Sequence, residues 1–144
     1  MKEYNLELLF EKYQTPLYVF DIDQLKDRVH YLRSSLPKRV ELCYAMKANP
    51  FLVKELENVV DKLEVCSPGE YYICENQQIA VDKLVISGVY KTPSAIEDML
   101  ENGTRVFTIE SMSQFDLLAN LALKFQVQLK LLLRLTSGNQ FGMS

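Results

Sequence analysis

The stretch Arg39-Val40-Glu41-Leu42-Cys43-Tyr44-Ala45-Met46-Lys47-Ala48-Asn49-Pro50 decides the fold of this chain. Side chains alternate between the two faces of a β-strand. One face therefore carries apolar residues suited to packing under helices, namely Val40, Leu42, Tyr44 and Met46. The other face is smaller and ends in a lysine, and it carries Glu41, Cys43, Ala45 and Lys47. In a parallel α/β barrel, catalytic groups sit at the C-terminal ends of strands. Lys47 is therefore a candidate Schiff-base nucleophile, because a desolvated amine loses its proton more readily.

Further strand-like runs follow at regular intervals, each separated from the next by a helical pattern. The predicted strands lie near residues 40–46, 63–66, 84–87, 105–109 and 128–135. Alternation of strands and helices favours a parallel sheet with right-handed crossovers. A closed barrel of this kind needs eight strands and typically about 250 residues. The 144 residues present therefore predict an α/β chain that forms an incomplete TIM barrel of about five strands.

The residues before the barrel are expected to form a separate lead-in over 1–38. The pattern predicts a helix over 1–14, a short strand over 17–20, and a second helix capped by Asp21 or Asp23. The barrel portion is then expected to run from 39 to 144.

Helix boundaries inside the barrel portion can also be predicted. Ser94 with Glu97, and Ser111 with Gln114, have the spacing of capping boxes. Asn102-Gly103 fits a helix stop. The run over 128–135 is almost continuously apolar, which predicts a strand buried on both faces.

Composition narrows the classes of protein that this chain can be. It is 48% hydrophobic and 24% charged with a net charge of -3, which indicates a globular protein. Acidic and basic residues are interspersed, so we expect neither a nucleic-acid partner nor a membrane. The cysteines Cys43, Cys66 and Cys74 have no metal-binding spacing, which favours reduced thiols and a cytoplasmic location. We expect Cys43 and Cys66 to be small buried core residues.

The segment Tyr44-Ala45-Met46-Lys47-Ala48-Asn49-Pro50 resembles the cofactor-lysine motif of the pyridoxal-phosphate decarboxylases of the alanine-racemase-like fold. This family includes the diaminopimelate, ornithine and arginine decarboxylases. The resemblance implies that Lys47 is catalytic and holds pyridoxal 5'-phosphate as a Schiff base. The segment Glu64-Val65-Cys66-Ser67-Pro68-Gly69-Glu70 resembles a second family motif, which makes Glu64 a candidate cofactor-binding residue.

Arg134 is the third candidate, because the family ends its fifth strand with a Leu-Arg pair that holds acids near the cofactor. Glu64 and Glu110 are its expected partners. Lys91 matches a lysine in another family segment, and Gln140-Phe141-Gly142 resembles the family's Lys-Phe-Gly with glutamine in place of lysine.

The resemblance implies decarboxylation of a basic or diamino acid of the diaminopimelate, ornithine, lysine or arginine type. The substrate would be a small-molecule amino acid, the full-length protein a homodimer, and this N-terminal portion inactive alone. Two other interpretations stay open: a non-catalytic or split regulatory homologue of the same fold, and an amino-acid racemase.

Overall fold

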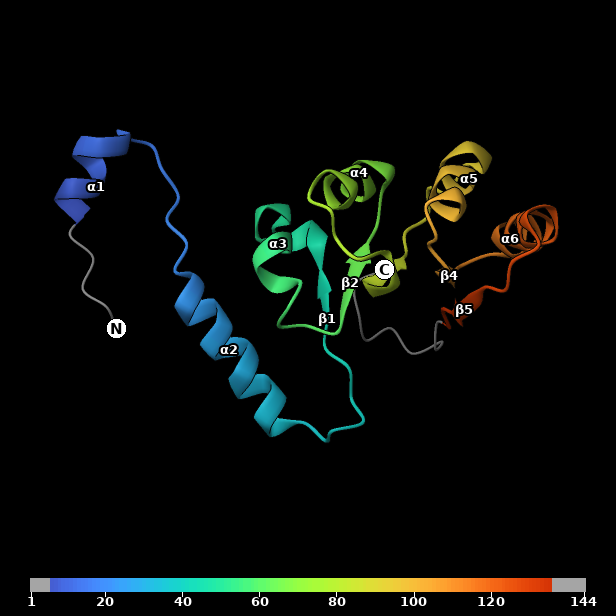
Figure 1. The fold of residues 1–144 in the computed structure, drawn as a ribbon, viewed down its shortest axis with the longest axis horizontal. Coiled ribbons are helices and arrows are strands. Elements are labelled where there is room, and N and C mark those ends of the chain that lie inside the picture. Colours follow the sequence, from blue (N-terminus) through green and yellow to red (C-terminus); the bar gives the residue numbers. More distant parts are fainter. Residues whose placement is uncertain (1–5, 136–144) are drawn as a thin grey trace.

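The computed structural model describes residues 6–135, which form a five-stranded parallel sheet and a layer of helices along one side of it (Figure 1). The strand order is β1-β2-β3-β4-β5, so each strand pairs with the next one along the chain. The strands are β1 (Cys43–Ala45), β2 (Lys62–Val65), β3 (Leu84–Ile86), β4 (Val106–Ile109) and β5 (Lys130–Leu133). This sequential parallel order confirms the predicted α/β repeat and incomplete barrel.

The connecting segments are helical, as predicted, but the first is short and broken. The α-helices are α3 (Val53–Leu56), α4 (Pro68–Asn76), α5 (Pro93–Glu101) and α6 (Met112–Phe125). The 3₁₀ turns are η1 (Met46–Ala48), η2 (Pro50–Leu52) and η3 (Val81–Lys83).

The core lies between the sheet and these helices. We call the sheet face that packs on the helices the outer face, and the opposite face the inner face. Seven outer-face side chains are almost fully buried, namely Met46, Leu63, Val65, Leu84, Ile86, Phe107 and Ile109. They pack with helical residues such as Ile96, Leu100 and Leu118. Burial of apolar surface at about 25 cal/mol per Å² is the main stabilising contribution here.

The N-terminal region forms an arm beside the sheet (Figure 1). It consists of α1 (Leu6–Tyr13) and α2 (Ile22–Ser35), the latter capped by Asp21, whose carboxylate accepts from the Gln24 amide at 3.0 Å. The predicted strand over 17–20 is wrong. This segment pairs with no other strand among residues 6–135, and Tyr18 is 92% exposed. Extended backbone becomes a strand only where a neighbour accepts its hydrogen bonds.

Two helix starts test the predicted capping boxes. Ser111 caps α6 as predicted, with its hydroxyl accepting from the Gln114 amide at 3.3 Å. The reciprocal half of the box differs, because the Gln114 side chain accepts from the amide of Glu110 rather than from that of Ser111. The box predicted at Ser94 is wrong, because Thr92 is the cap and Pro93 occupies the first helical position. Proline suits that position because its missing N–H would have no helical partner. The predicted stop is confirmed by Asn102 at the end of α5 and by Gly103 with φ +94°.

The last strand differs from the prediction in its environment. β5 begins at Lys130, and its side chains are exposed or only partly buried. It pairs with β4 alone among the described strands, so it is an edge strand, and Leu135 just beyond it is 87% exposed. An apolar run therefore predicted the strand but not which of its faces would be covered.

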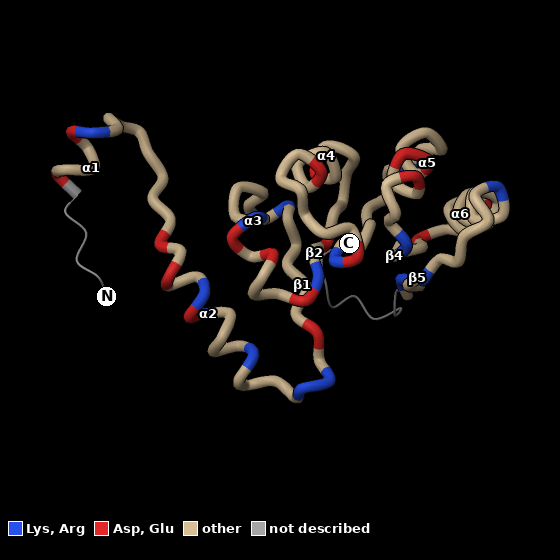
Figure 2. The backbone as a smooth tube through the Cα atoms, in the orientation of Figure 1, with Lys and Arg blue, Asp and Glu red and all other residues tan. Residues whose placement is uncertain are grey.

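Charged residues of both signs are spread over the described chain, although α4 and α5 carry acidic residues only (Figure 2). Two ion pairs join the arm to the rest of the described chain. Arg33 contacts the Asp61 carboxylate and donates to the Val40 carbonyl at 2.9 Å, and the Lys26 ammonium lies 3.7 Å from the Glu55 carboxylate. No helix within residues 6–135 is long and apolar enough to cross a membrane.

Candidate functional site at the carboxyl ends of the strands

Lys47 lies at the end of β1, where a parallel sheet gathers the ends of all its strands. The strand stops at Ala45, and Lys47 stands in the middle of η1 rather than in the strand itself. Met46 before it is fully buried. Two further contacts fix the turn: the Tyr44 hydroxyl donates to the Asn49 carbonyl at 3.0 Å, and the Asn49 side chain accepts from the Phe51 amide at 3.1 Å. Lys47 is exposed, so an accessible amine stands on an anchored turn.

Glu64 sits on the neighbouring strand, in register with Ala45. Its carboxylate accepts from the Ser87 hydroxyl at 2.8 Å, and the Ser87 oxygen lies 3.1 Å from the Cys66 sulfur. Because the Ser87 hydroxyl donates to Glu64, the thiol of Cys66 is the donor to Ser87. The chain of contacts runs across β2 and the end of β3 on the inner face. Ser87 was not predicted as a site residue, although its alternation with Val85 would have placed it there.

The cysteines near this cluster correct one prediction. Cys43 is exposed and Cys66 is partly buried, whereas Cys74 lies in the core. The predicted burial of Cys43 and Cys66 in the core is therefore wrong, because their strand face is the inner one, which the helices do not cover. Partial desolvation by the surrounding protein raises the pKa of the Cys43 thiol, and the nearby Glu64 carboxylate raises it further. In the core, burial raises the pKa of Cys74 to about 11.

Arg134 and Glu110 form the far end of the inner face. The Arg134 guanidinium lies 3.6 Å from the Glu110 carboxylate, and its backbone amide donates to Ile109 at 2.9 Å. The Arg134 side chain is 68% exposed and that of Glu110 is 12% exposed. The expected pairing with Glu110 is confirmed. Glu64, the other expected partner, accepts from Ser87 instead.

Lys91 lies between these two groups of residues. Its ammonium donates to the Gly88 carbonyl and to the Gln114 side chain at 3.4 Å. Burial lowers the pKa of Lys91, while the Glu110 carboxylate and the Cys66 sulfur oppose that shift. Lys91 therefore belongs to the same edge of the sheet as Lys47 and Arg134, on a different loop.

The turns after β2 and β4 share one construction. Ser67 caps α4, and Glu70 accepts from the strand-end amide of Cys66 at 2.8 Å. After β4, Gln114 accepts from the Glu110 amide at 3.0 Å in the same way. Glu70 thus has a local structural role, which satisfies an amide at the end of a strand. The segment Gln140-Phe141-Gly142 lies outside the described residues.

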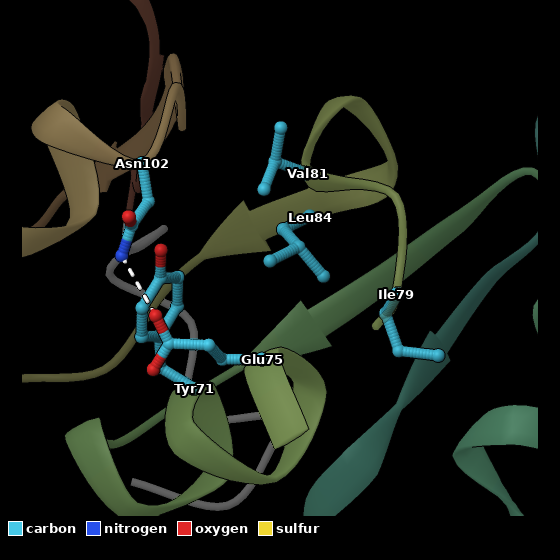
Figure 3. A pocket seen from close by; sticks show the side chains of 6 residues that line it. All are labelled: Tyr71, Glu75, Ile79, Val81, Leu84 and Asn102. Atoms are coloured by element: carbon cyan, nitrogen blue, oxygen red, sulfur yellow. Dashed lines mark hydrogen bonds between the residues drawn. The ribbon is translucent and has the colours of Figure 1, made fainter. Parts of the chain in front are cut away.

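A pocket of about 220 Å³ occurs elsewhere in the described part of the chain. Figure 3 shows it between α4 and the segment leading into β3, with Glu75 and Asn102 joined by a 2.9 Å hydrogen bond. Its lining residues Ile79, Val81 and Leu84 precede or begin β3, and Asn102 precedes β4. The pocket is therefore at the amino ends of the strands, opposite Lys47, so it is not the candidate site.

Comparison with known proteins gives a consistent result over most of the chain. A curated diaminopimelate decarboxylase of Aquifex aeolicus is 31% identical over 132 residues, which are 90% of this chain and 31% of that protein. A crystal structure from Aquifex aeolicus matches with a TM-score of 0.79 at 30% identity, covering 90% of this chain and 33% of the other. A Helicobacter pylori diaminopimelate decarboxylase structure, complexed with L-lysine, matches with a TM-score of 0.79 at 25% identity. The match covers 91% of this chain and 34% of the other.

The chain thus spans about a third of the length of these relatives. The family model described as pyridoxal-dependent decarboxylase, pyridoxal binding domain, matches residues 22–143. That range includes Lys47, the helix-covered sheet and the whole candidate site. The cofactor of this domain is pyridoxal 5'-phosphate, and the chain belongs to the pyridoxal-dependent decarboxylase family.

Proposed function

We propose that Lys47 binds pyridoxal 5'-phosphate through its ε-amino group, and that the protein decarboxylates a basic or diamino acid. The observation that carries the proposal is the placement of Lys47. It is exposed, its turn is anchored by Met46 and Asn49, and it stands at the strand ends. Catalytic groups of parallel barrels are found at that edge.

The residues near Lys47 fit the chemistry of such a cofactor. The amine is accessible, and Glu64 uses one carboxylate oxygen for Ser87 and keeps the other for a further donor. Arg134 holds Glu110 while most of its side chain stays exposed. We therefore propose Glu64 and Arg134 as cofactor-binding residues. The glycines within residues 6–135 stand singly at Gly69, Gly88 and Gly103, so we assign no phosphate-binding loop among them.

The protein's share of the chemistry is placement and electrostatics. Bound pyridoxal phosphate supplies the electron sink that makes loss of a carboxylate possible. Lys47 holds the reacting position, while the Ser87 hydroxyl fixes the orientation of the Glu64 carboxylate. Glu110 in turn fixes Arg134. A charged group that is held by a neighbour loses less entropy when it binds a ligand.

The substrate class rests on the relatives. The curated protein from Aquifex aeolicus is a diaminopimelate decarboxylase, and the Helicobacter pylori enzyme was solved with L-lysine. Both point to a small-molecule amino acid with a second amine. We further propose a homodimer for the full-length protein. Three free cysteines support a reducing, cytoplasmic setting.

Covalent labelling tests the role of Lys47. The protein is mixed with pyridoxal phosphate, reduced with borohydride, and digested for peptide mapping. We expect one main adduct, on Lys47, and its loss in Lys47→Arg. Lys38→Arg is the matched control, because Lys38 is an exposed lysine shortly before the same strand, and it should leave the labelling unchanged. An adduct spread evenly over exposed lysines would contradict the proposal.

Release of carbon dioxide from diaminopimelate, lysine and ornithine tests the reaction in the full-length protein. We expect activity on at least one of them, with Lys47→Ala lowering kcat by about 10³-fold or more, because the covalent attachment is lost. Labelling of Lys47 without any carbon dioxide release would keep the cofactor role and overturn the decarboxylation.

A further inference from the structure

Gln114 makes more contacts at the candidate site than any role as a helix residue requires. Its side-chain oxygen accepts from the Glu110 amide at 3.0 Å and from the Lys91 ammonium at 3.4 Å. Its side-chain nitrogen donates to the Val89 carbonyl at 3.2 Å. A flipped amide would oppose every one of these contacts, so the network itself fixes the orientation of the carboxamide.

These contacts join two loops that are far apart in sequence. Val89 and Lys91 belong to the loop between β3 and α5, and Glu110 to the turn between β4 and α6. The first loop is also closed on itself, because Lys91 donates to the Gly88 carbonyl. Gln114 therefore holds residues 88–91 next to the end of β4, where Glu110 follows the strand.

The corresponding turn after β2 shows what the amide adds. Glu70 occupies the same place, three residues after the capping serine, and accepts from the Cys66 amide at 2.8 Å. A carboxylate has no donor, so it can satisfy the strand-end amide but cannot reach a carbonyl on another loop. The contact from Gln114 to Val89 is the one that only the amide can make.

We propose that Gln114 is a positioning residue of the candidate site. Its carboxamide holds residues 88–91 against the end of β4, because it binds the Lys91 ammonium and the Val89 carbonyl as well as the Glu110 amide. Arg134 lies 3.6 Å from the Glu110 carboxylate, so Gln114 connects the loop that carries Lys91 to the ion pair at the strand ends. The importance of this connection for the cofactor rests on the proposed function, whereas the contacts themselves do not.

We call the contacts of the Gln114 side chain with Val89, Lys91 and Glu110 the clamp. Hydrogen exchange of the Glu110 amide tests the part of the clamp in which the Gln114 side chain is an acceptor. Gln114→Ala removes the acceptor, and we expect the Glu110 amide to exchange about fivefold to tenfold faster. Gln114→Glu keeps an acceptor oxygen, so that amide should stay protected to within about twofold. Asn120→Asp is the matched control, because it makes the same change of amide to acid at an exposed position of the same helix. Equal exchange rates of the Glu110 amide in the wild type and in the three variants would overturn the proposal.

The pH dependence of Lys91 acylation gives a second readout that loss of stability alone would not produce. The titratable groups that face Lys91 are Glu110 after β4 and Cys66 after β2. Gln114→Glu adds a negative charge near the ammonium, so the midpoint of Lys91 acylation should move up by about one pH unit. Gln114→Ala should move it less, and Asn120→Asp not at all. An unchanged midpoint in Gln114→Glu would overturn the proposal.

Titration of the full-length protein with pyridoxal phosphate connects the clamp to the cofactor. We expect Gln114→Ala to weaken the apparent affinity by about fivefold or more, with partial rescue in Gln114→Glu. Normal affinity in Gln114→Ala would overturn the positioning role. If the wild-type protein binds no cofactor, the proposed function is overturned instead. The exchange rate of the Glu110 amide and the pH dependence of Lys91 acylation would then still test whether Gln114 holds the two loops together.

Discussion

The two faces of the sheet are built from alternate residues of the same strands, yet they differ in almost every property. The outer face is apolar, and its side chains are between 0% and 5% exposed at positions such as Leu63 and Phe107. The inner face carries Glu64, which accepts a hydrogen bond from Ser87, and Glu110, which forms an ion pair with Arg134. Covering by helices thus makes one face the source of stability, whereas no helix within residues 6–135 covers the other face, which is left for polar chemistry.

The largest effect is expected from adjacent residues of β4 that point to opposite faces. Phe107 is fully buried on the outer face, so Phe107→Ala should lower the free energy of unfolding by about 3–5 kcal/mol. Thr108 next to it has a buried hydroxyl with no hydrogen-bond partner among the described residues. Thr108→Val should therefore be neutral or stabilising by up to about 1 kcal/mol. Urea denaturation of both variants measures the difference in their free energies of unfolding. Similar losses of stability in the two variants would contradict the division between the faces.

A second contrast compares two glycines close to the strand ends. Gly88 follows β3 with φ +88°, and a Cβ there would collide with the backbone carbonyl of Cys66. Gly88→Ala should cost about 2–4 kcal/mol, because neither the left-handed backbone nor the strand beside it can easily move.

Gly69 is the matched control for this prediction. It lies in the first turn of α4, where a Cβ would come no closer than 3.9 Å to the Ser67 hydroxyl. Gly69→Ala should raise the melting temperature slightly, by the equivalent of about 0.5–1 kcal/mol. If thermal melting showed the same loss of stability for Gly88→Ala and Gly69→Ala, the close approach of the Cys66 carbonyl to Gly88 would not be the cause of the loss.

The sequence predicted those features that depend on local pattern. Alternation along β1 correctly separated Tyr44 and Met46 from Cys43, and the repeat of strands and helices predicted the sheet order. It failed where a distant partner decides the outcome. Cys43 is exposed because helices cover only the other face, and β5 is exposed because it forms an edge.

The same limit applied to the candidate site. Lys47 and the pairing of Arg134 with Glu110 could be predicted from motifs. The contacts of Ser87 with Glu64 and of Gln114 with Val89 join residues that are 23 and 25 positions apart. Strand register brings Ser87 to Glu64, and the packing of α6 beside the loop after β3 brings Gln114 to Val89, and no local pattern records either arrangement.

The smallest expected effect compares one carboxylate from each side of the sheet. Glu57 is a buried residue at the end of α3, and its carboxylate accepts from the Ala80 amide and from the Lys54 ammonium, both at 2.9 Å. The Ala80 amide, followed by Lys54, lowers the pKa of Glu57 below its ordinary value of 4.5. Glu57→Gln should cost about 1–2 kcal/mol at pH 7.

The pH dependence of that loss identifies its cause. A depressed pKa in the folded state stabilises the protein fully above the unfolded-state pKa of 4.5, and the stabilisation disappears as the pH falls through the folded-state value. The difference between wild type and Glu57→Gln in urea denaturation should therefore shrink below pH 4.5 and be constant from pH 6 to 8. Glu64→Gln on the inner face should cost less than about 0.5 kcal/mol at pH 7, since an amide oxygen can still accept from Ser87. A larger loss at Glu64 than at Glu57 would mean that the inner face also carries stability, and the division between the faces would fail.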